Sequence, residues 1–283
     1  MKALITGAQG QLGRALATYC PAGWTCVALS RAECDLAREA SIRTAIAQHR
    51  PDVVLNAAAY TAVDRAEQEE DRAMAINGSA PGILRDALNA YGGRLVHIST
   101  DFVFDGAKST AYRPDDTCCP LGAYGRSKAA GEMAAGPDAL VVRTSWLYAA
   151  GGTNFVRTML RQLQERYEVR VVADQIAAPT WAARLAKTIW ALTLKDACGI
   201  FHHRDAGIAS WYDVAIAIQE EALRLGLLHR KIPILPIATL DYPMPARRPT
   251  RPRGPAAPRS INRHPTSSAT PSTRPTSSAS KKR

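Results

Sequence analysis

A glycine turn near the start of the chain constrains the fold more than any other feature. The run Gly7-Ala-Gln-Gly10-Gln-Leu-Gly13 lies directly between a short apolar stretch, residues 2–6, and an amphipathic helical pattern over residues 11–19. In such a turn one glycine makes the tight bend, one lets the backbone approach a pyrophosphate, and one packs the helix against the strand. The free N–H groups of the helix then face the phosphates. The turn therefore predicts a dinucleotide site, and its spacing is GxxGxxG instead of GxGxxG.

Apolar runs and helical patterns alternate along the rest of the chain. Further strands are predicted at residues 24–29, 52–56, 94–99, 140–143 and 169–172. Helices are predicted at residues 38–49, 67–91 (interrupted near Pro81), 153–165, 181–194 and 210–225. Strands that alternate with helices of about 10–15 residues imply βαβ units and a parallel sheet. We predict an α/β fold: a doubly wound parallel sheet (Rossmann fold) over residues 1–150, to which some later segments return, and a smaller C-terminal part over residues 151–249.

Ten of the eleven net positive charges lie in the last part of the chain. Residues 247–283 hold ten of the 36 Lys and Arg and no Asp or Glu, which leaves 26 basic and 25 acidic residues before them. Residues 250–283 are rich in Pro, Ser, Thr and Arg and cannot bury enough apolar surface to fold, so we predict a disordered basic tail. The abrupt change in composition suggests that this tail is an out-of-frame translation. A role in nucleic-acid binding would depend on the tail alone, and we do not favour it.

Several classes of protein are excluded by composition. Met1-Lys2-Ala3 leads into an apolar stretch that ends at Gly7, which leaves no room for a signal peptide. No later apolar run approaches the roughly 18 residues of a membrane span. The six cysteines show no CxxC pairing, so we expect reduced thiols and neither a disulfide framework nor a metal site. The chain is therefore expected to be cytoplasmic, without association with a membrane.

Residues at the ends of the second and third strands refine the cofactor prediction. Ser30-Arg31 occupies the place where an acidic side chain would bind the adenosine 2′-hydroxyl of NAD, and a hydroxyl with an arginine suits a 2′-phosphate. NADPH is thus preferred, and NADH stays open because Arg31 would also serve as an ordinary surface residue. Asp35-Leu36 lies in a loop where the adenine ring could bind. Small residues follow the third strand, at a place where the nicotinamide ribose must come close to the backbone. The predicted cofactor-binding residues are Gly7, Gly10, Gln11, Leu12, Gly13, Arg31, Asp35, Leu36, Ala57, Ala58, Ala59, Tyr124 and Lys128.

The catalytic residues are predicted from two motifs, the end of the fourth strand and a YxxxK pair. Tyr124 and Lys128 lie four residues apart, on one face of a helix. A tyrosine has an unperturbed pKa of about 10, and a nearby ammonium would shift this pKa toward working pH. Thr100 ends the fourth strand, where open α/β sheets bind ligands, and can hydrogen-bond the same substrate oxygen. We predict Thr100, Tyr124 and Lys128 as the catalytic residues.

Several stretches together resemble one family of the extended short-chain dehydrogenase/reductases. The chain is similar to the dTDP-4-dehydrorhamnose reductase family over about residues 1–249, in the segments 56–64, 96–106, 143–148, 174–180, 210–212 and 242–249. The resemblance implies NADPH-dependent reduction of the C4 ketone of dTDP-4-dehydro-L-rhamnose, with residues 151–249 mainly binding substrate. It further implies that Thr100 orients the carbonyl, that Tyr124 protonates the alkoxide, that Lys128 holds the ribose, and that Thr100, Asp101 and Trp146 contact the sugar. Core packing is the alternative role for Trp146.

Two departures from the family pattern and three alternatives stay open. Some family members bind Mg²⁺ at a dimer interface through a glutamate where this chain has Ala15, so a metal is doubtful although a homodimer is compatible with the resemblance. The basic tail also replaces a further apolar helix of the family.

A related nucleotide-sugar epimerase or dehydratase is the nearest alternative, but Phe102 stands where a dehydratase has its glutamate base. The others are a non-catalytic regulatory subunit that binds the cofactor, and a sibling 6-deoxysugar as the product.

Overall fold

The computed structural model describes residues 1–242 and 244–249, which belong to one compact unit. The tail predicted to be disordered, residues 250–283, lies outside the described residues. The central sheet has six parallel strands in the order β10-β5-β4-β3-β1-β2. Their bounds are β1 Lys2–Thr6, β2 Thr25–Leu29, β3 Val53–Asn56, β4 Arg94–Thr100, β5 Leu140–Thr144 and β10 Gly199–His202.

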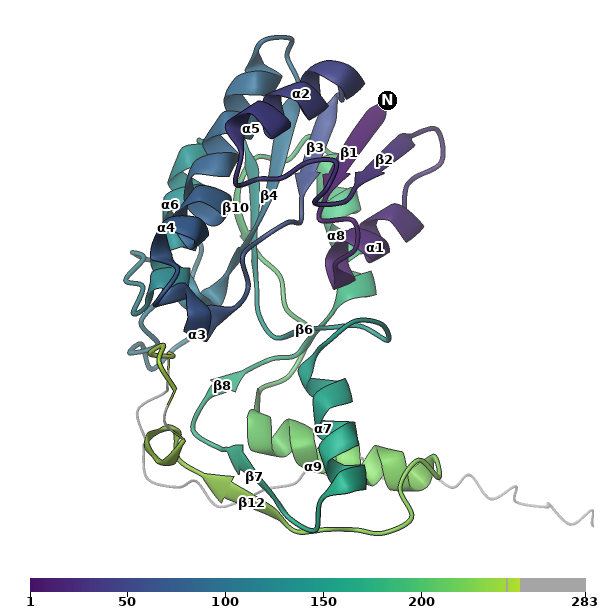
Figure 1. Cartoon of the computed structure of the whole chain (residues 1–283), viewed down its shortest axis with the longest axis vertical. Coiled ribbons are helices and arrows are strands. Elements are labelled where there is room, and N and C mark those ends of the chain that lie inside the picture. The colour runs from purple at the N-terminus through teal and green to yellow at the C-terminus, as the bar shows by residue number, and fades with distance from the viewer. Residues whose placement is uncertain (243, 250–283) are drawn as a thin grey trace, which may run out of the picture. The chain divides into compact units, whose positions relative to one another are not determined.

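Helices cover both faces of this sheet, as Figure 1 shows. One face carries α2 (Glu39–His49), α5 (Ala80–Asn89) and α6 (Ala123–Ala135), and the other carries α1 (Gln11–Thr18) and α8 (Ala182–Thr193). Alternate residues of each strand enter opposite cores: Leu4 packs with the α2–α5–α6 side, whereas Ala3 and Ile5 pack with the α1–α8 side. Since strands buried on both faces are apolar throughout, the short apolar runs of the sequence form the centre of the sheet. The predicted doubly wound parallel fold is confirmed.

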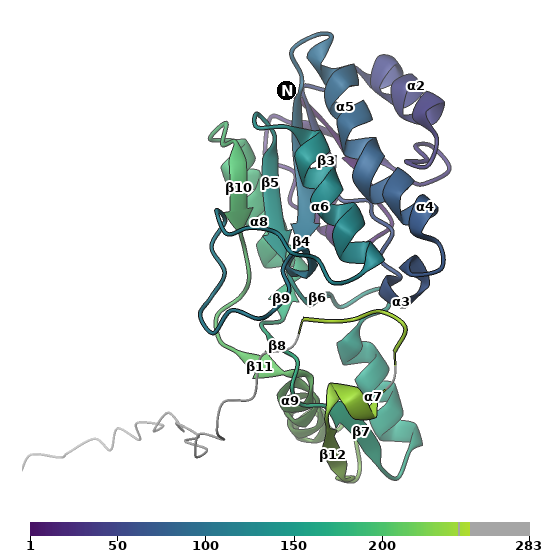
Figure 2. The ribbon, with the colours of Figure 1, turned by 90° about the vertical axis from the view of Figure 1, so that its left-hand side faces the viewer.

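Segments after residue 150 build a separate, smaller core. Its helices are α7 (Phe155–Glu165) and α9 (Trp211–Arg224), and its strands are β7 (Val169–Val172) and β12 (Ile234–Ile237). These two strands pair in parallel, and both helices pack beside them (Figures 1 and 2). The start of α9 is determined locally, because Ser210 and Asp213 form a reciprocal capping box. Short pairs complete this part: β6 (Leu147–Tyr148) with β9 (Thr180–Trp181), and β8 (Ile176–Ala177) with β11 (Ala209–Ser210).

The predicted helix over residues 67–91 is divided into several pieces. The structure has α3 (Val63–Ala66), α4 (Glu70–Ala73), a π-helical turn at Met74–Ser79, and then α5, whose first turn contains Pro81. The side chain of Asn77, within the π turn, donates to Ser127 Oγ at 3.0 Å and also bonds both backbone groups of Tyr60. The wider π turn thus connects α6 to the loop after β3, both of which line the site described below.

Residues 169–172 form the expected strand within the C-terminal part, where it pairs with β12, and β10 is a later segment that returns to the central sheet beside β5. Apolar character shows that a strand is buried but does not show which partner it takes. Cys20 and Cys26 form a disulfide, although we expected reduced thiols throughout, and the remaining cysteines are free. A cytoplasmic location, which partly rested on cysteine usage, stays a prediction.

Candidate active site

The glycine turn has the close contacts that its sequence pattern predicts. Gly7 adopts a left-handed backbone with φ +67°, and a Cβ atom there would lie 2.8 Å from the backbone of Ala58. A Cβ atom on Gly13 would lie 2.2 Å from the carbonyl oxygen of Gly7, so α1 can approach β1 only because this residue has no side chain. Gly10 stands at the N-terminus of α1, and no side chain caps the helix there. The first N–H groups of α1 are thus available to a phosphate.

A cavity of about 730 Å³ runs from this turn past the ends of β3, β4 and β5. Its volume falls within the range typical of small-molecule sites. With the exception of Gly13, every predicted cofactor, catalytic and substrate residue lines the cavity, including Arg31, Thr100, Asp101, Tyr124, Lys128 and Trp146. Arg31 is exposed at the rim, 3.5 Å from the carboxylate of Asp35. Gly13 lies behind the turn, where it shapes the cavity without lining it.

Tyr124 and Thr100 meet at the carboxyl end of β4. Burial raises the pKa of Tyr124 to about 12; the hydroxyl of Thr100 partly lowers this pKa and the carboxylate of Asp101 raises it. We predicted a lowered pKa, and the structure shows a raised one because burial dominates. Burial also raises the pKa of Asp101 to about 6, against the lowering effect of the hydrogen bond that Thr100 donates at 3.1 Å. At neutral pH the phenol of Tyr124 is therefore a protonated, buried acid.

Lys128 is almost fully buried on the same face of α6 as Tyr124. Its Nζ donates to the carbonyl oxygen of Ile98 at 2.5 Å and lies 3.3 Å from Nε2 of His97. Burial lowers the pKa of Lys128 to about 8, although the carboxylate of Glu132 one turn later raises it. The amine is thus held beneath the end of β4, beside the cavity floor.

An ion pair with both partners buried lies behind this helix face. Arg143 on β5 donates to both carboxylate oxygens of Glu132, at 2.9 and 2.7 Å, and the hydroxyl of Ser99 also donates to this carboxylate. The side chains of Arg143 and Glu132 are only 4% and 5% exposed. The guanidinium of Arg143 further donates to the carbonyl oxygen of Pro114 and lies 5.0 Å from the ring of Phe104. The pair thus joins α6, β4 and β5 to the loop that follows β4.

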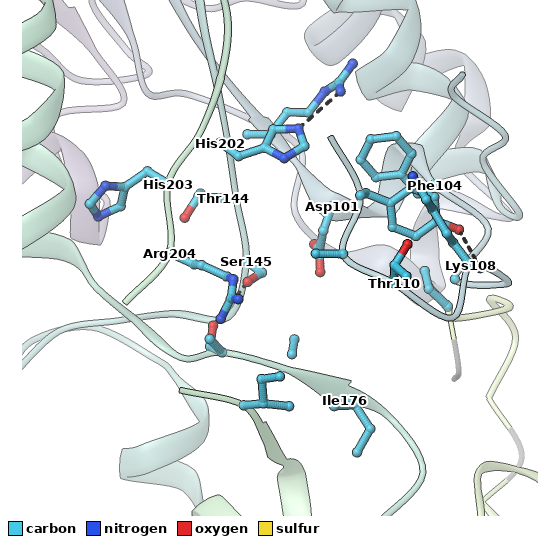
Figure 3. Close-up of a pocket in the computed structure, with 18 residues that line it drawn as sticks. Asp101, Phe104, Lys108, Thr110, Thr144, Ser145, Ile176, His202, His203 and Arg204 are labelled. Atoms are coloured by element: carbon cyan, nitrogen blue, oxygen red, sulfur yellow. Dashed lines mark hydrogen bonds between the residues drawn. The ribbon is translucent and has the colours of Figure 1, made fainter. Parts of the chain in front are cut away.

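A second cavity, of about 390 Å³, lies beyond Asp101 and is drawn in Figure 3. His202, His203 and Arg204 line one side, and Phe104, Lys108 and Thr110 line the other. Asp101, Thr144 and Ser145 line both cavities, so the two spaces meet at the predicted reaction centre. Sequence reasoning assigned no role in binding to Phe104, Lys108, Arg143, His202, His203 or Arg204. Phe104 and Arg143 stand inside stretches that carry the resemblance, whereas no motif marks the other four.

Trp146 lines the larger cavity and has an unusual backbone, with φ +45°. Its ring stacks on that of Trp211 with 3.6 Å between the centroids, and the ring of Phe155 lies 4.4 Å from Trp211. A tryptophan rarely adopts a positive φ, which costs about 1–3 kcal/mol and is found mainly at functional sites. The aromatic stack joins Trp146 to the smaller core, against which Trp211 and Phe155 pack.

The family model described as RmlD substrate binding domain matches residues 1–253. The chain belongs to this family. A dTDP-4-dehydrorhamnose reductase of Burkholderia thailandensis is 45% identical, with 88% of each chain covered. A dTDP-4-keto-6-deoxy-D-glucose reductase of Streptomyces niveus is 42% identical, with 75% of each covered.

Among solved structures, the dTDP-4-dehydrorhamnose reductase of Bacillus anthracis in complex with NADP matches with a TM-score of 0.83 at 35% identity. The alignment covers 88% of each chain. Within residues 1–242 and 244–249 of this RmlD-family chain, no group of three His, Cys, Asp or Glu side chains is placed to hold a metal ion. In the same residues no helix has the length and apolar character that crossing a membrane requires.

Proposed function

We propose that this chain reduces the C4 ketone of dTDP-4-dehydro-L-rhamnose to dTDP-L-rhamnose with NADPH, the last step of dTDP-rhamnose biosynthesis. The observation that carries the proposal is the placement of Thr100, Tyr124 and Lys128 beside a dinucleotide-sized cavity, where it meets a second cavity. The identity to named reductases and the match to a structure in complex with NADP support the same reaction.

The glycine turn and the loops beside it would hold the cofactor. Gly7, Gly10 and the start of α1 suit the pyrophosphate, because their backbone leaves room for it and presents free N–H groups. Arg31 at the rim suits a 2′-phosphate, and Lys128 suits the nicotinamide ribose. NADPH, when bound, supplies a hydride. Mg²⁺ has no further support among the described residues, and a homodimer stays a prediction.

Tyr124 would supply the proton that completes the reduction. The hydroxyl of Thr100 orients the carbonyl oxygen of C4, and the phenol of Tyr124 gives its proton to that oxygen as the alkoxide develops. Because burial keeps the pKa of Tyr124 at about 12, the phenol is protonated at every working pH and is available as an acid. One proton is then returned to Tyr124 from solvent in each turnover.

The second cavity would hold the rest of the nucleotide sugar. Arg204 lines one side of this cavity, where it suits the negative charge of a diphosphate, whereas Lys108 on the other side is paired with Asp116. Trp146 offers an aromatic face to the sugar from the wall of the larger cavity. A dehydratase is disfavoured, because Asp101 is followed by Phe102 and the acid pair that elimination requires is incomplete.

The test is consumption of NADPH by the full-length chain with dTDP-4-dehydro-L-rhamnose, followed through the loss of reduced-nicotinamide absorbance. The change Tyr124→Phe removes the acidic hydroxyl and keeps the ring, and it should lower kcat by about 10²–10⁴-fold. The variant should still bind NADPH, which fluorescence titration measures. Turnover that Tyr124→Phe leaves unchanged would refute the assigned role of Tyr124.

Two other outcomes would redirect the proposal. Binding of NADPH without turnover would favour a regulatory subunit or a chain inactivated by its altered C-terminus, and replacement of the tail by a family-like helix would separate these. Formation of a different 6-deoxysugar would change the assigned product, since a relative at 42% identity is named a dTDP-4-keto-6-deoxy-D-glucose reductase. Analysis of the product by chromatography and NMR decides between the sugars.

A further inference from the structure

A chain of four buried polar side chains crosses the sheet beneath the reaction centre. It runs from Thr6 on β1 through Asn56 on β3 and His97 on β4 to Lys128 on α6. The distances are 2.7 Å from Thr6 Oγ1 to Asn56 Oδ1, 3.1 Å from Asn56 Nδ2 to His97 Nδ1, and 3.3 Å from His97 Nε2 to Lys128 Nζ. None of the four residues is more than 1% exposed. Water therefore does not supply their hydrogen bonds, and each must satisfy the next.

The hydroxyl of Thr6 gives these hydrogen bonds their direction. The N–H of Ala58 donates to Thr6 Oγ1 at 3.4 Å, and the hydroxyl of Thr6 then donates to the amide oxygen of Asn56. This orientation turns the NH₂ group of Asn56 toward Nδ1 of His97, which must accept. A neutral imidazole that accepts at Nδ1 carries its proton on Nε2. His97 therefore directs an N–H group at Lys128.

This donor places a condition on the lysine. An ammonium group has three donors and no acceptor, so it would face the Nε2–H of His97 donor to donor. A neutral amine accepts from His97 and still donates to the carbonyl oxygen of Ile98. The hydrogen-bond pattern is thus complete only when Lys128 is uncharged.

The neighbouring charges are compatible with this state. Glu132, one turn along α6, is the anion that favours a charged Lys128, but it accepts two hydrogen bonds from Arg143 and one from Ser99. The guanidinium on β5 thus neutralises the carboxylate. Burial lowers the pKa of Lys128 to about 8, and burial also holds the pKa of His97 well below its usual value.

We propose that His97, oriented by Asn56 and Thr6, is a positioning residue that keeps Lys128 mostly a neutral amine above pH 8 in the free protein, and that Lys128 gains a proton when NADPH binds at such a pH. On binding, the amine of Lys128 stops accepting the hydrogen bond from Nε2–H of His97 and takes a proton from solvent. The resulting ammonium donates a hydrogen bond to the nicotinamide ribose. The inference rests on the proposed function for its second half, whereas the tautomer of His97 does not depend on any activity.

The first test reads that tautomer directly in the full-length protein. Long-range ¹H–¹⁵N NMR correlation spectra distinguish a protonated Nε2 from a protonated Nδ1, and His97→Gln assigns the signals. The expected result without cofactor is a neutral ring with its proton on Nε2. A proton on Nδ1, or on both nitrogens, overturns the proposal even if the protein is an active reductase.

The second test counts protons taken up on binding of NADPH. Calorimetry at pH 8.5 in buffers of different ionisation enthalpy should show an uptake of about three-quarters of a proton per site, for a lysine that moves from a pKa of about 8 to its ordinary value. The change Asn56→Asp offers only acceptors to His97, which moves the ring proton to Nδ1 and lets Nε2 accept from an ammonium. The uptake should then disappear.

Asn89→Asp serves as the matched control, because it adds the same charge at an exposed position at the end of α5. This control should keep the full uptake. No uptake by the unaltered chain, or equal uptake by Asn56→Asp and the control, overturns the proposal. Failure to bind NADPH at all refutes the proposed function instead, and the NMR experiment still decides the role of His97.

Discussion

The buried pair of Glu132 and Arg143 allows a quantitative prediction about stability. The change Glu132→Gln keeps the shape of the side chain and removes its charge. In the variant the guanidinium of Arg143 has only uncharged partners: the new amide oxygen at position 132, Pro114 O and His202 Nε2, at 3.2 and 3.3 Å, and Cys118 Sγ. Since both side chains are at most 5% exposed, water cannot replace the lost carboxylate.

Removal of one partner of a buried ion pair costs about 3–5 kcal/mol. For a folded unit of this size each kcal/mol corresponds to roughly 2–4 °C in Tm, so Glu132→Gln should lower Tm by roughly 6–20 °C. Thermal unfolding followed by circular dichroism measures this change, with urea unfolding as an independent measure of free energy. The control is the double variant Glu132→Gln with Arg143→Met, which removes the uncompensated charge and should recover most of the lost free energy.

Two results would refute this reasoning. A loss below about 1 kcal/mol for Glu132→Gln would mean that the pair behaves like an exposed one. Equal and additive losses for Glu132→Gln and Arg143→Met would mean that the two side chains do not depend on each other.

Three further predictions concern the cofactor turn, the reaction centre and the C-terminal segment. Gly7→Ala should weaken NADPH binding at least 10-fold in a fluorescence titration, because the new Cβ would lie 2.8 Å from Ala58 and the residue has φ +67°; affinity equal to that of the unaltered chain would contradict this. The raised pKa of Asp101, about 6 against an ordinary 3.8, means that the unaltered chain loses stability as pH rises from about 4 to 6. Asp101→Asn should therefore be more stable at pH 7 than the unaltered chain, by up to about 3 kcal/mol in urea unfolding, but not at pH 4; the same difference at both pH values would be inconsistent with a buried carboxylate. Arg248 donates to both carboxylate oxygens of Asp64 and lowers its pKa, so this pair stabilises above the ordinary carboxyl pKa and is lost as pH falls below it. Because Asp64 is 38% exposed, Asp64→Asn should cost only about 1 kcal/mol at pH 7 in urea unfolding, and a larger loss would indicate a role beyond this ion pair.

The sequence by itself determined the parts that depend on short-range pattern. Gly7, Gly10 and Gly13 are spaced for one turn, and Tyr124 and Lys128 are spaced for one helical face. Apolar runs of four to six residues also showed which segments are buried strands. Such features can be read locally because the turn, the helix period and the strand period each repeat within a few residues.

The tertiary structure decided what depends on contacts between distant residues. Only the fold placed β10 beside β5, brought His97 against Lys128, and paired Asp64 with Arg248 across 184 positions of the chain. It also reversed the pKa shift expected for Tyr124, because burial is a property of the whole neighbourhood. Sequence spacing shows which groups share an element, whereas desolvation and hydrogen-bond direction depend on every element packed around them.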